Sequence, residues 1–343
     1  MKTDRRHTAD ESRSGPFAPR GGMGRREFLR KAACAGAGLV VGAAGTEALA
    51  AKEGPIAKRV LGRTKEKVTI LGLGTAPIGE GPVNTKDAVR IFGEVMDRGV
   101  NYVDTAYIYG NAEEALGHLV PKRRDKLFLV TKVWTDNAAR AEKLLSTSLR
   151  RLKTDHVDLV HIHNVGGKNI DKVLAKEGVL NYLLKQKEQG KLRFIGLSGH
   201  CRPPRFVRVI KTGQIDVVMP VMNYADRNIY NFESVVLPEC RKRNIGVVAM
   251  KVYVGIKGGF PYHRKGYVGC ATEPALLPQA MAYVLDLKGV AVANVGPYTL
   301  EQAIQNVEFA RKYKPLTAEQ RDKLLARGKQ LAQKIGPRYG PVK

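Results

Sequence analysis

The chain has 343 residues, a hydrophobic fraction of 43% and a formal net charge of +26, from 58 Lys and Arg against 32 Asp and Glu. The length allows one large barrel or two smaller domains. The charge raises the question of nucleic acid, but the basic residues are spread along the chain, without zinc-finger spacing, an arginine-rich arm or an RNA-binding aromatic signature. We therefore predict a basic solvated surface, attracted at most to anionic envelope components, and no nucleic-acid partner.

The cysteine pattern argues against a metal site and against a complete disulfide framework. No two of the cysteines form a CxxC pair, which makes a zinc or iron–sulfur site a weak interpretation. Cys34 lies in a segment that we expect to be removed, which leaves an odd number. The cysteines are Cys34, Cys201, Cys240 and Cys270.

The N-terminal segment resembles a twin-arginine (Tat) signal. After a polar stretch over 1–22, Arg25 and Arg26 precede Phe-Leu and the mild apolar run 32–44, and Ala48-Leu-Ala50 has the small–x–small pattern of a cleavage site. The run is too short and too rich in Gly and Ala to span a bilayer well. We predict an extension and signal over 1–50 and a barrel over 51–343. The Tat machinery would be a partner, the location would be periplasmic or otherwise exported, and no stable membrane insertion would follow cleavage.

The mature chain opens with a predicted hairpin and the first barrel strand. Two short β-prone runs flank a polar turn over 60–70 and would plug the floor of a barrel. Residues 71–79 then read as a strand and its loop, whose glycines allow backbone to approach a ligand. The segment 85–98 is a predicted helix with Thr85 as N-cap and an apolar stripe at helical spacing.

Three successive strands end in residues whose side chains can take part in catalysis. The run 101–104 ends in Asp104, with Tyr109 on the loop after it, and the next runs, 127–132 and 157–163, end in Lys132 and His163. A lone Lys or His at a strand end is usually a solvated terminus, and the first stretch alone fits a turn with surface tyrosines. In a parallel β/α arrangement, however, the carboxyl ends of neighbouring strands meet on one rim. We therefore expect these four side chains to converge.

The same alternation of strands and helices continues to the C-terminus. Strands of β-branched residues alternating with amphipathic helices predict a parallel sheet, and eight units between 69 and 309 predict an α/β fold closed into a (β/α)8 TIM barrel. An extra C-terminal helix is expected over 317–335. The remaining predicted helices are 112–120, 137–152, 169–189, 203–211, 233–244, 278–287 and 299–309, and the remaining strands are 193–198, 217–223, 245–251 and 290–295.

At this point the mature region resembles the aldo-keto reductase family over nearly its whole length. The pattern Asp-x-Ala-x-x-Tyr-Gly, followed by a strand-end Lys and a strand-end His, is specific, whereas the glycines alone would be weak. The matching segments are Gly72-Leu-Gly-Thr75, Asp104-Thr-Ala-Tyr-Ile-Tyr-Gly110, Thr131-Lys132, Asp158-Leu-Val-His-Ile-His163, Ile195-Gly-Leu-Ser198 and Asn294-Val-Gly296.

The resemblance implies reduction of an aldehyde or ketone with NAD(P)H, or the reverse reaction on an alcohol. By position, Tyr109 would be the general acid, Lys132 would stabilise its phenolate, Asp104 would hold the ammonium, and His163 would orient the carbonyl. NADP is the cofactor implied, with NAD as the alternative. The implied cofactor contacts are Gly74, Thr75, Ser198, Gly199, Asn223, Gly296 and Asn306.

Several positions depart from the family pattern around the cofactor. Gly199 stands where Asn is common, Met219 where Gln binds the carboxamide, and Met250 where an aromatic ring stacks on nicotinamide. Gly296 and Gln302 align with the Lys and Arg of NADPH-preferring relatives. These departures leave three possibilities open: binding of NADP, binding of NAD, or loss of cofactor binding. If cofactor binding is lost, the alternative function is a catalytically silent barrel that acts as an envelope binding protein. Substrate specificity would lie in the loops 135–140, 225–233 and 257–274.

Overall fold

The structure, a computed structural model, describes residues 54–255 and 269–343, and all of them belong to one compact unit. The predicted signal over 1–50 and most of the 257–274 insert lie outside the described residues. Within the two described ranges, no helix has both the length and the apolar composition that crossing a membrane requires.

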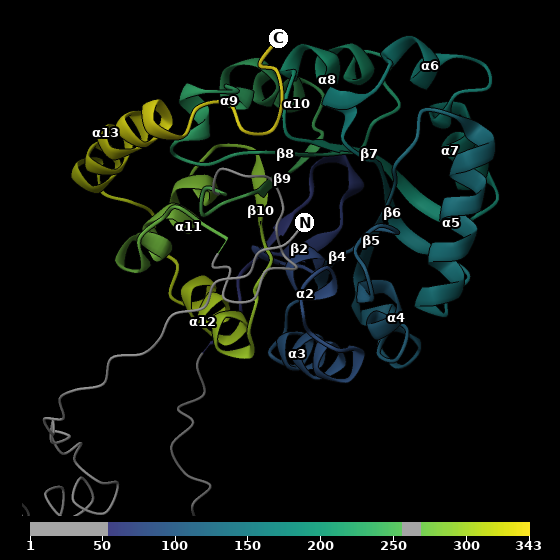
Figure 1. Cartoon of the computed structure of the whole chain (residues 1–343), viewed down its shortest axis with the longest axis horizontal. Helices are drawn as coiled ribbons and strands as arrows, with labels where there is room; N and C mark the ends of the chain where they lie inside the picture. The colour runs from purple at the N-terminus through teal and green to yellow at the C-terminus, as the bar shows by residue number, and fades with distance from the viewer. Residues whose placement is uncertain (1–53, 256–268) are drawn as a thin grey trace, which may run out of the picture. The chain divides into compact units, whose positions relative to one another are not determined.

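Eight parallel strands close into a barrel, which confirms the predicted (β/α)8 fold (Figure 1). Each strand pairs with its sequence neighbour, and the last closes onto the first through the register Asn294↔Gly72. The barrel strands are β3 (Leu71–Gly74), β4 (Tyr102–Asp104), β5 (Phe128–Val133), β6 (Val157–Ile162), β7 (Leu192–Gly199), β8 (Val217–Pro220), β9 (Gly246–Met250) and β10 (Val290–Val295).

The helices surround the strands, as Figure 1 shows, and the core cluster includes buried apolar side chains from both helices and strands. The stripe predicted on the helix that begins near residue 85 is buried, from Ala88 to Met96. The helices are α2 (Ala76–Gly79), α3 (Thr85–Asp97), α4 (Ala112–Leu116), α5 (Ala138–Leu152), α6 (Ile170–Leu174), α7 (Val179–Glu188), α8 (Pro203–Ile210), α9 (Phe232–Val235), α10 (Leu237–Lys242), α11 (Leu277–Leu285), α12 (Leu300–Arg311) and α13 (Ala318–Ile335).

The predicted hairpin is present and closes the amino end of the barrel. Strands β1 (Lys58–Val60) and β2 (Lys67–Thr69) pair antiparallel. Leu61 and Val68 are fully buried in the cluster that fills the barrel interior, together with the stacked rings of Tyr102 and Phe128. This apolar filling closes the lower interior of the barrel, and the pocket that contains the strand-end residues lies at the carboxyl end.

Three local predictions were wrong, each because a specific contact prevailed over the pattern. The N-cap of α3 is Asn84, whose side-chain oxygen accepts the backbone N–H of Asp87, and not Thr85. The helix expected over 169–189 breaks into α6 and α7 at Gly178, whose backbone packs too close to the carbonyl oxygen of Lys172 for a side chain. The helix expected over 233–244 divides at Val236, just before a proline that enters α10 in its first turn.

Candidate active site

The centre of the site is a buried ion pair between Lys132 and Asp104. Alternation along β5 places Lys132 in the interior, where its ammonium lies 2.7 and 2.8 Å from the two carboxylate oxygens of Asp104 and 2.7 Å from the carbonyl oxygen of Thr105. The two side chains are 0% and 3% exposed. Burial lowers the pKa of Lys132, and the Asp104 carboxylate opposes that shift. The pair thus holds the Lys132 amine in one position inside the barrel mouth.

The loop after β4 brings Tyr109 onto this pair. The Lys132 ammonium lies 4.6 Å from the centroid of the tyrosine ring. Gly110 makes the placement feasible: it has a positive φ of 49°, and a Cβ there would lie 1.9 Å from the carbonyl oxygen of Gly79 at the end of α2. The loop that carries Tyr109 therefore packs directly against the end of α2, which follows β3, and lies beside the Lys132 ammonium.

His163, the residue directly after β6, completes the arrangement. Its ring lies 5.9 Å from the ring of Tyr109, edge to face. Burial, reinforced by the charge of Lys132, holds the pKa of His163 well below its usual range, so the imidazole is neutral at neutral pH. Among the described residues, its buried Nδ1 atom has no hydrogen-bond partner. The structure thus brings together all four residues that the strand-end rule selected.

These residues open into a pocket of about 690 Å³, which is within the usual size of small-molecule sites. Asp104, Tyr109 and His163 line one part of it, and the loops after β3, β9 and β10 contribute many of the other lining residues. The predicted cofactor contacts that line the pocket are Gly74, Gly296 and Asn306.

The other predicted cofactor contacts lie outside the pocket lining. Thr75 is buried and donates its hydroxyl to the carbonyl oxygen of Asp104, and Gly199 packs against the Phe206 ring. Asn223 is fully engaged by protein: its amide donates to Asp226 and to the Lys251 carbonyl, and its oxygen accepts from two backbone N–H groups. This geometry gives Asn223 a structural role in place of the predicted cofactor contact.

Ser198 differs from these three. Its hydroxyl is buried without a hydrogen-bond partner among the described residues, and the residue pairs in the sheet with Met219, which does line the pocket. A buried hydroxyl without a hydrogen-bond partner in the protein destabilises the fold unless a ligand or water supplies that hydrogen bond.

Three residues of the site were missed by sequence reasoning. Asn294 on β10 donates to the Asp104 carboxylate at 3.1 Å, although it was quoted only as part of a motif. Trp134 is 42% exposed and lies 4.9 Å from the His163 ring; as the only tryptophan of the chain, next to the Lys132 strand, it offered a signal. Glu80 lines the pocket, and burial raises its pKa to about 7.

A closed barrel with a buried lysine–carboxylate pair, a tyrosine and a histidine at its carboxyl rim defines an oxidoreductase of the aldo/keto type. Residues 70–261 match the aldo/keto reductase family, so the chain belongs to that family.

The chain is similar to relatives from several organisms. It is 27% identical over 293 residues to L-galactose dehydrogenase of Arabidopsis thaliana, covering 76% of this chain and 90% of the relative. The holo form of the aldo-keto reductase AKR11C1 from Bacillus halodurans superposes with a TM-score of 0.64 at 26% identity, over 79% of this chain and 96% of that one. An aldo/keto reductase from Klebsiella pneumoniae, in complex with NADP and acetate, shares the fold with a TM-score of 0.63 at 23% identity, over 80% and 96%.

Proposed function

We propose that the protein interconverts an aldehyde or ketone and its alcohol with NADP(H), and that Tyr109 is the general acid. The observation that carries the proposal is the Lys132 ammonium, held by Asp104 and placed 4.6 Å from the Tyr109 ring at the wall of the pocket.

Tyr109 would donate its hydroxyl proton to the carbonyl oxygen of the substrate. A free phenol has a pKa of about 10, so it holds its proton at neutral pH but gives it up reluctantly. The nearby ammonium stabilises the phenolate that remains, and the bonds from Lys132 to Asp104 and Thr105 fix that charge in place. Proton transfer of this kind is typically worth about 10²–10⁴-fold in rate.

His163 would orient the carbonyl oxygen rather than titrate. Because its imidazole is neutral, one ring nitrogen donates a hydrogen bond while the other accepts. Its position, edge-on to Tyr109, would place the two donors on one carbonyl oxygen.

The pocket fits a dinucleotide cofactor of the kind that family membership implies. Bound NADP(H) would supply the hydride. The unpartnered Ser198 hydroxyl and the buried, unpartnered side-chain oxygen of Asn294 would face its amide end. A Cβ at Gly296 would lie 2.6 Å from Pro77, so only glycine fits at this point of the pocket wall, next to Gly74. Asn306, which accepts a 2.8 Å hydrogen bond from Tyr253, also lines the pocket.

Titration of the purified protein with NADPH and NADH, followed by fluorescence, tests the cofactor. We expect binding of at least one nucleotide, and NADPH-dependent reduction of a simple aldehyde that falls by about 10²–10⁴-fold in Tyr109→Phe with nucleotide affinity unchanged. If neither nucleotide binds and no aldehyde is reduced, the catalytically silent binding protein replaces this proposal.

We also propose that the protein is exported by the Tat route. The support is the sequence of the N-terminal segment: Arg25 and Arg26, a mild apolar run and a small–x–small site that ends at Ala50. Cell fractionation of the wild type and of the Arg25→Lys, Arg26→Lys variant tests this. Processed wild-type protein outside the cytoplasm and retained variant would support export, whereas equal retention of both would contradict it.

A further inference from the structure

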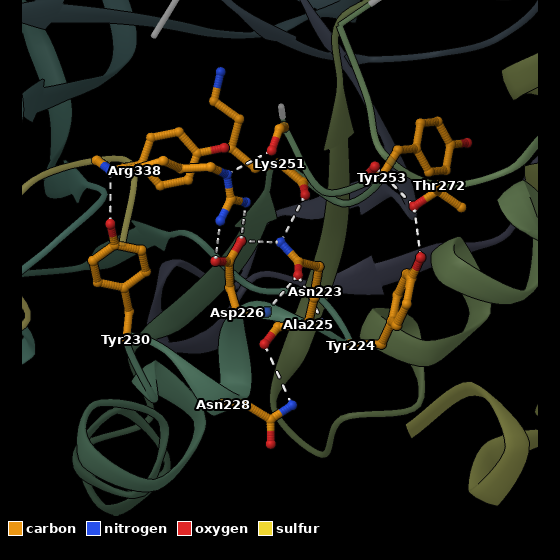
Figure 2. A network of polar contacts seen from close by, with 12 residues as sticks. Asn223, Tyr224, Ala225, Asp226, Asn228, Tyr230, Lys251, Tyr253, Thr272 and Arg338 are labelled. Atoms are coloured by element: carbon orange, nitrogen blue, oxygen red, sulfur yellow. Dashed lines mark hydrogen bonds and ion pairs between the residues drawn. The ribbon is translucent and has the colours of Figure 1, made fainter. Parts of the chain in front are cut away.

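The inner face of the barrel carries a buried histidine, His161, whose ring nitrogens lack partners. Figure 2 shows the usual state of buried polar groups in this protein: the Asp226 carboxylate accepts two hydrogen bonds from Arg338, at 2.7 and 2.8 Å, and one from Asn223 at 2.6 Å. By contrast, neither ring nitrogen of His161 forms a hydrogen bond of normal geometry with another described residue, and the side chain is fully buried. Such a group is costly unless the protein or a water supplies its hydrogen bonds.

His161 lies on β6, next to the lysine of the active site. It pairs in the sheet with Lys132 on one side and with Gly196 on the other. Alternation along the strand turns His161 toward the barrel interior, on the same face as His163 two residues later. Gly196 leaves room for the ring, because a Cβ there would lie 2.3 Å from its Nδ1 atom. Burial, reinforced by the charge of Lys132, holds the pKa of His161 well below its usual range, so the imidazole is neutral.

A second unpartnered nitrogen follows on the same inner face. It is Nδ1 of His163, a residue that is 4% exposed, and it has no hydrogen-bond partner within the described ranges of the chain. Because His163 lines the pocket, the other nitrogen of its ring, Nε2, is the one available to a substrate. The two imidazoles are close enough for a charge on His161 to contribute, after burial and the charges of Lys132 and His200, to the lowered pKa of His163.

The spacing of the two histidines suits one water molecule. Residues two apart on one face of a strand are separated by about 6.7 Å. A water that makes two hydrogen bonds of about 2.8 Å spans about 5.6 Å, so it reaches both rings. The Ser198 hydroxyl follows at the level of His163 on the neighbouring strand β7, since Ile162 pairs with Leu197 just before them. This hydroxyl is also buried and unpartnered among the described residues, and it offers the water a third polar neighbour.

We propose that a buried water binds between His161 and His163, and that His161 is a positioning residue that fixes the His163 ring through this water. The water donates to Nδ1 of His163, so the proton of the neutral ring stays on Nε2, where it is donated to the carbonyl oxygen of the substrate. His161 bonds the water and is not among the residues that line the pocket. The catalytic consequence rests on the reductase function proposed above, whereas the water site does not.

Nitrogen-15 NMR of the full chain, labelled at histidine, tests the water site without reference to activity. The ring-nitrogen chemical shifts report which nitrogen carries the proton and whether the other accepts a hydrogen bond, and His163 is assigned from the signals that disappear in His163→Asn. We expect the wild-type proton on Nε2 and a hydrogen-bonded Nδ1. In His161→Leu, the Nδ1 signal should move to the position of a nitrogen that accepts no hydrogen bond. A wild-type proton on Nδ1, a wild-type Nδ1 without a hydrogen bond, or an identical Nδ1 signal in His161→Leu would overturn the proposal.

Two further variants make this result specific to the water. In His161→Gln the amide keeps a donor and an acceptor, so the hydrogen-bonded Nδ1 signal of His163 should be retained. The matched control is His156→Leu, which removes a partly exposed imidazole bonded to Asp155 and should leave the His163 signals unchanged. If His161→Leu does not fold, the wild-type spectrum still decides the proposal. Loss of the hydrogen-bonded signal in His156→Leu would contradict it.

Steady-state reduction of butanal tests the positioning role. In His161→Leu we expect kcat to fall by about tenfold, with the Kd of NADPH within about twofold of wild type, because only the orientation of His163 is lost. His161→Gln should stay within about threefold of the wild-type kcat. A folded His161→Leu protein with wild-type kcat would overturn the positioning role. Absence of nucleotide binding and turnover in the wild type would instead reject the reductase function, and the nitrogen spectra would still decide whether the water is bound.

Discussion

Replacing Lys132 with methionine tests the electrostatic core of the mechanism. The ammonium lies 4.6 Å from the Tyr109 ring centroid. With an effective dielectric constant of about 20, its attraction for a phenolate at that distance is about 3.6 kcal/mol, or roughly 400-fold in rate. We therefore expect kcat/KM for NADPH-dependent aldehyde reduction to fall by at least that factor, because Tyr109 must then release its proton without a neighbouring charge.

The same substitution has a separate cost in stability that must be measured alongside. Removing one partner of a buried pair leaves the Asp104 carboxylate with only Asn294 as a side-chain donor, and such losses cost about 3–5 kcal/mol. Urea denaturation gives this value, and the double variant Asp104→Leu, Lys132→Met should recover part of it while remaining inactive. The control Lys187→Met removes an ammonium from the Asp216 pair outside the pocket and should keep full activity. A folded Lys132→Met protein that retains more than about a tenth of wild-type kcat/KM would refute the electrostatic argument.

Four further outcomes are expected. Ser198→Ala should weaken NADPH binding several-fold without loss of stability, as measured by fluorescence titration. Asn223→Ala should lower the free energy of unfolding by about 2–4 kcal/mol, as measured by urea denaturation, because it leaves several buried polar groups without hydrogen-bond partners. Burial raises the pKa of Glu80 from 4.5 to about 7, so between these pH values the folded protein holds a proton that the unfolded chain releases, and stability should fall as pH rises. Glu80→Gln should remove that dependence, and an identical pH profile would contradict it. Gly110→Ala should destabilise the protein and reduce kcat, since its Cβ would meet the Gly79 carbonyl and displace the tyrosine loop; unchanged thermal unfolding and kcat would show that the loop adapts.

The sequence was a good guide wherever the signal is local and repeated. The alternation of β-branched strands with amphipathic helices predicted the barrel, since each element buries one face independently of its distant neighbours. It was a poorer guide to element ends. The N-cap at Asn84 and the break at Gly178 depend on individual hydrogen bonds and close backbone contacts that no periodic pattern encodes.

By itself, the sequence determined that an acid, a phenol, an amine and an imidazole would end up on one rim, because parallel strands carry their carboxyl ends to the same edge. Only the tertiary structure decided which other groups join them. Asn294 meets Asp104 across 190 residues, and Arg338 meets Asp226 across 112. Such pairs form because the barrel closes and because the C-terminal residues 336–343 return to its mouth. Their partners are set by packing in three dimensions, so no residue spacing in the sequence predicts them.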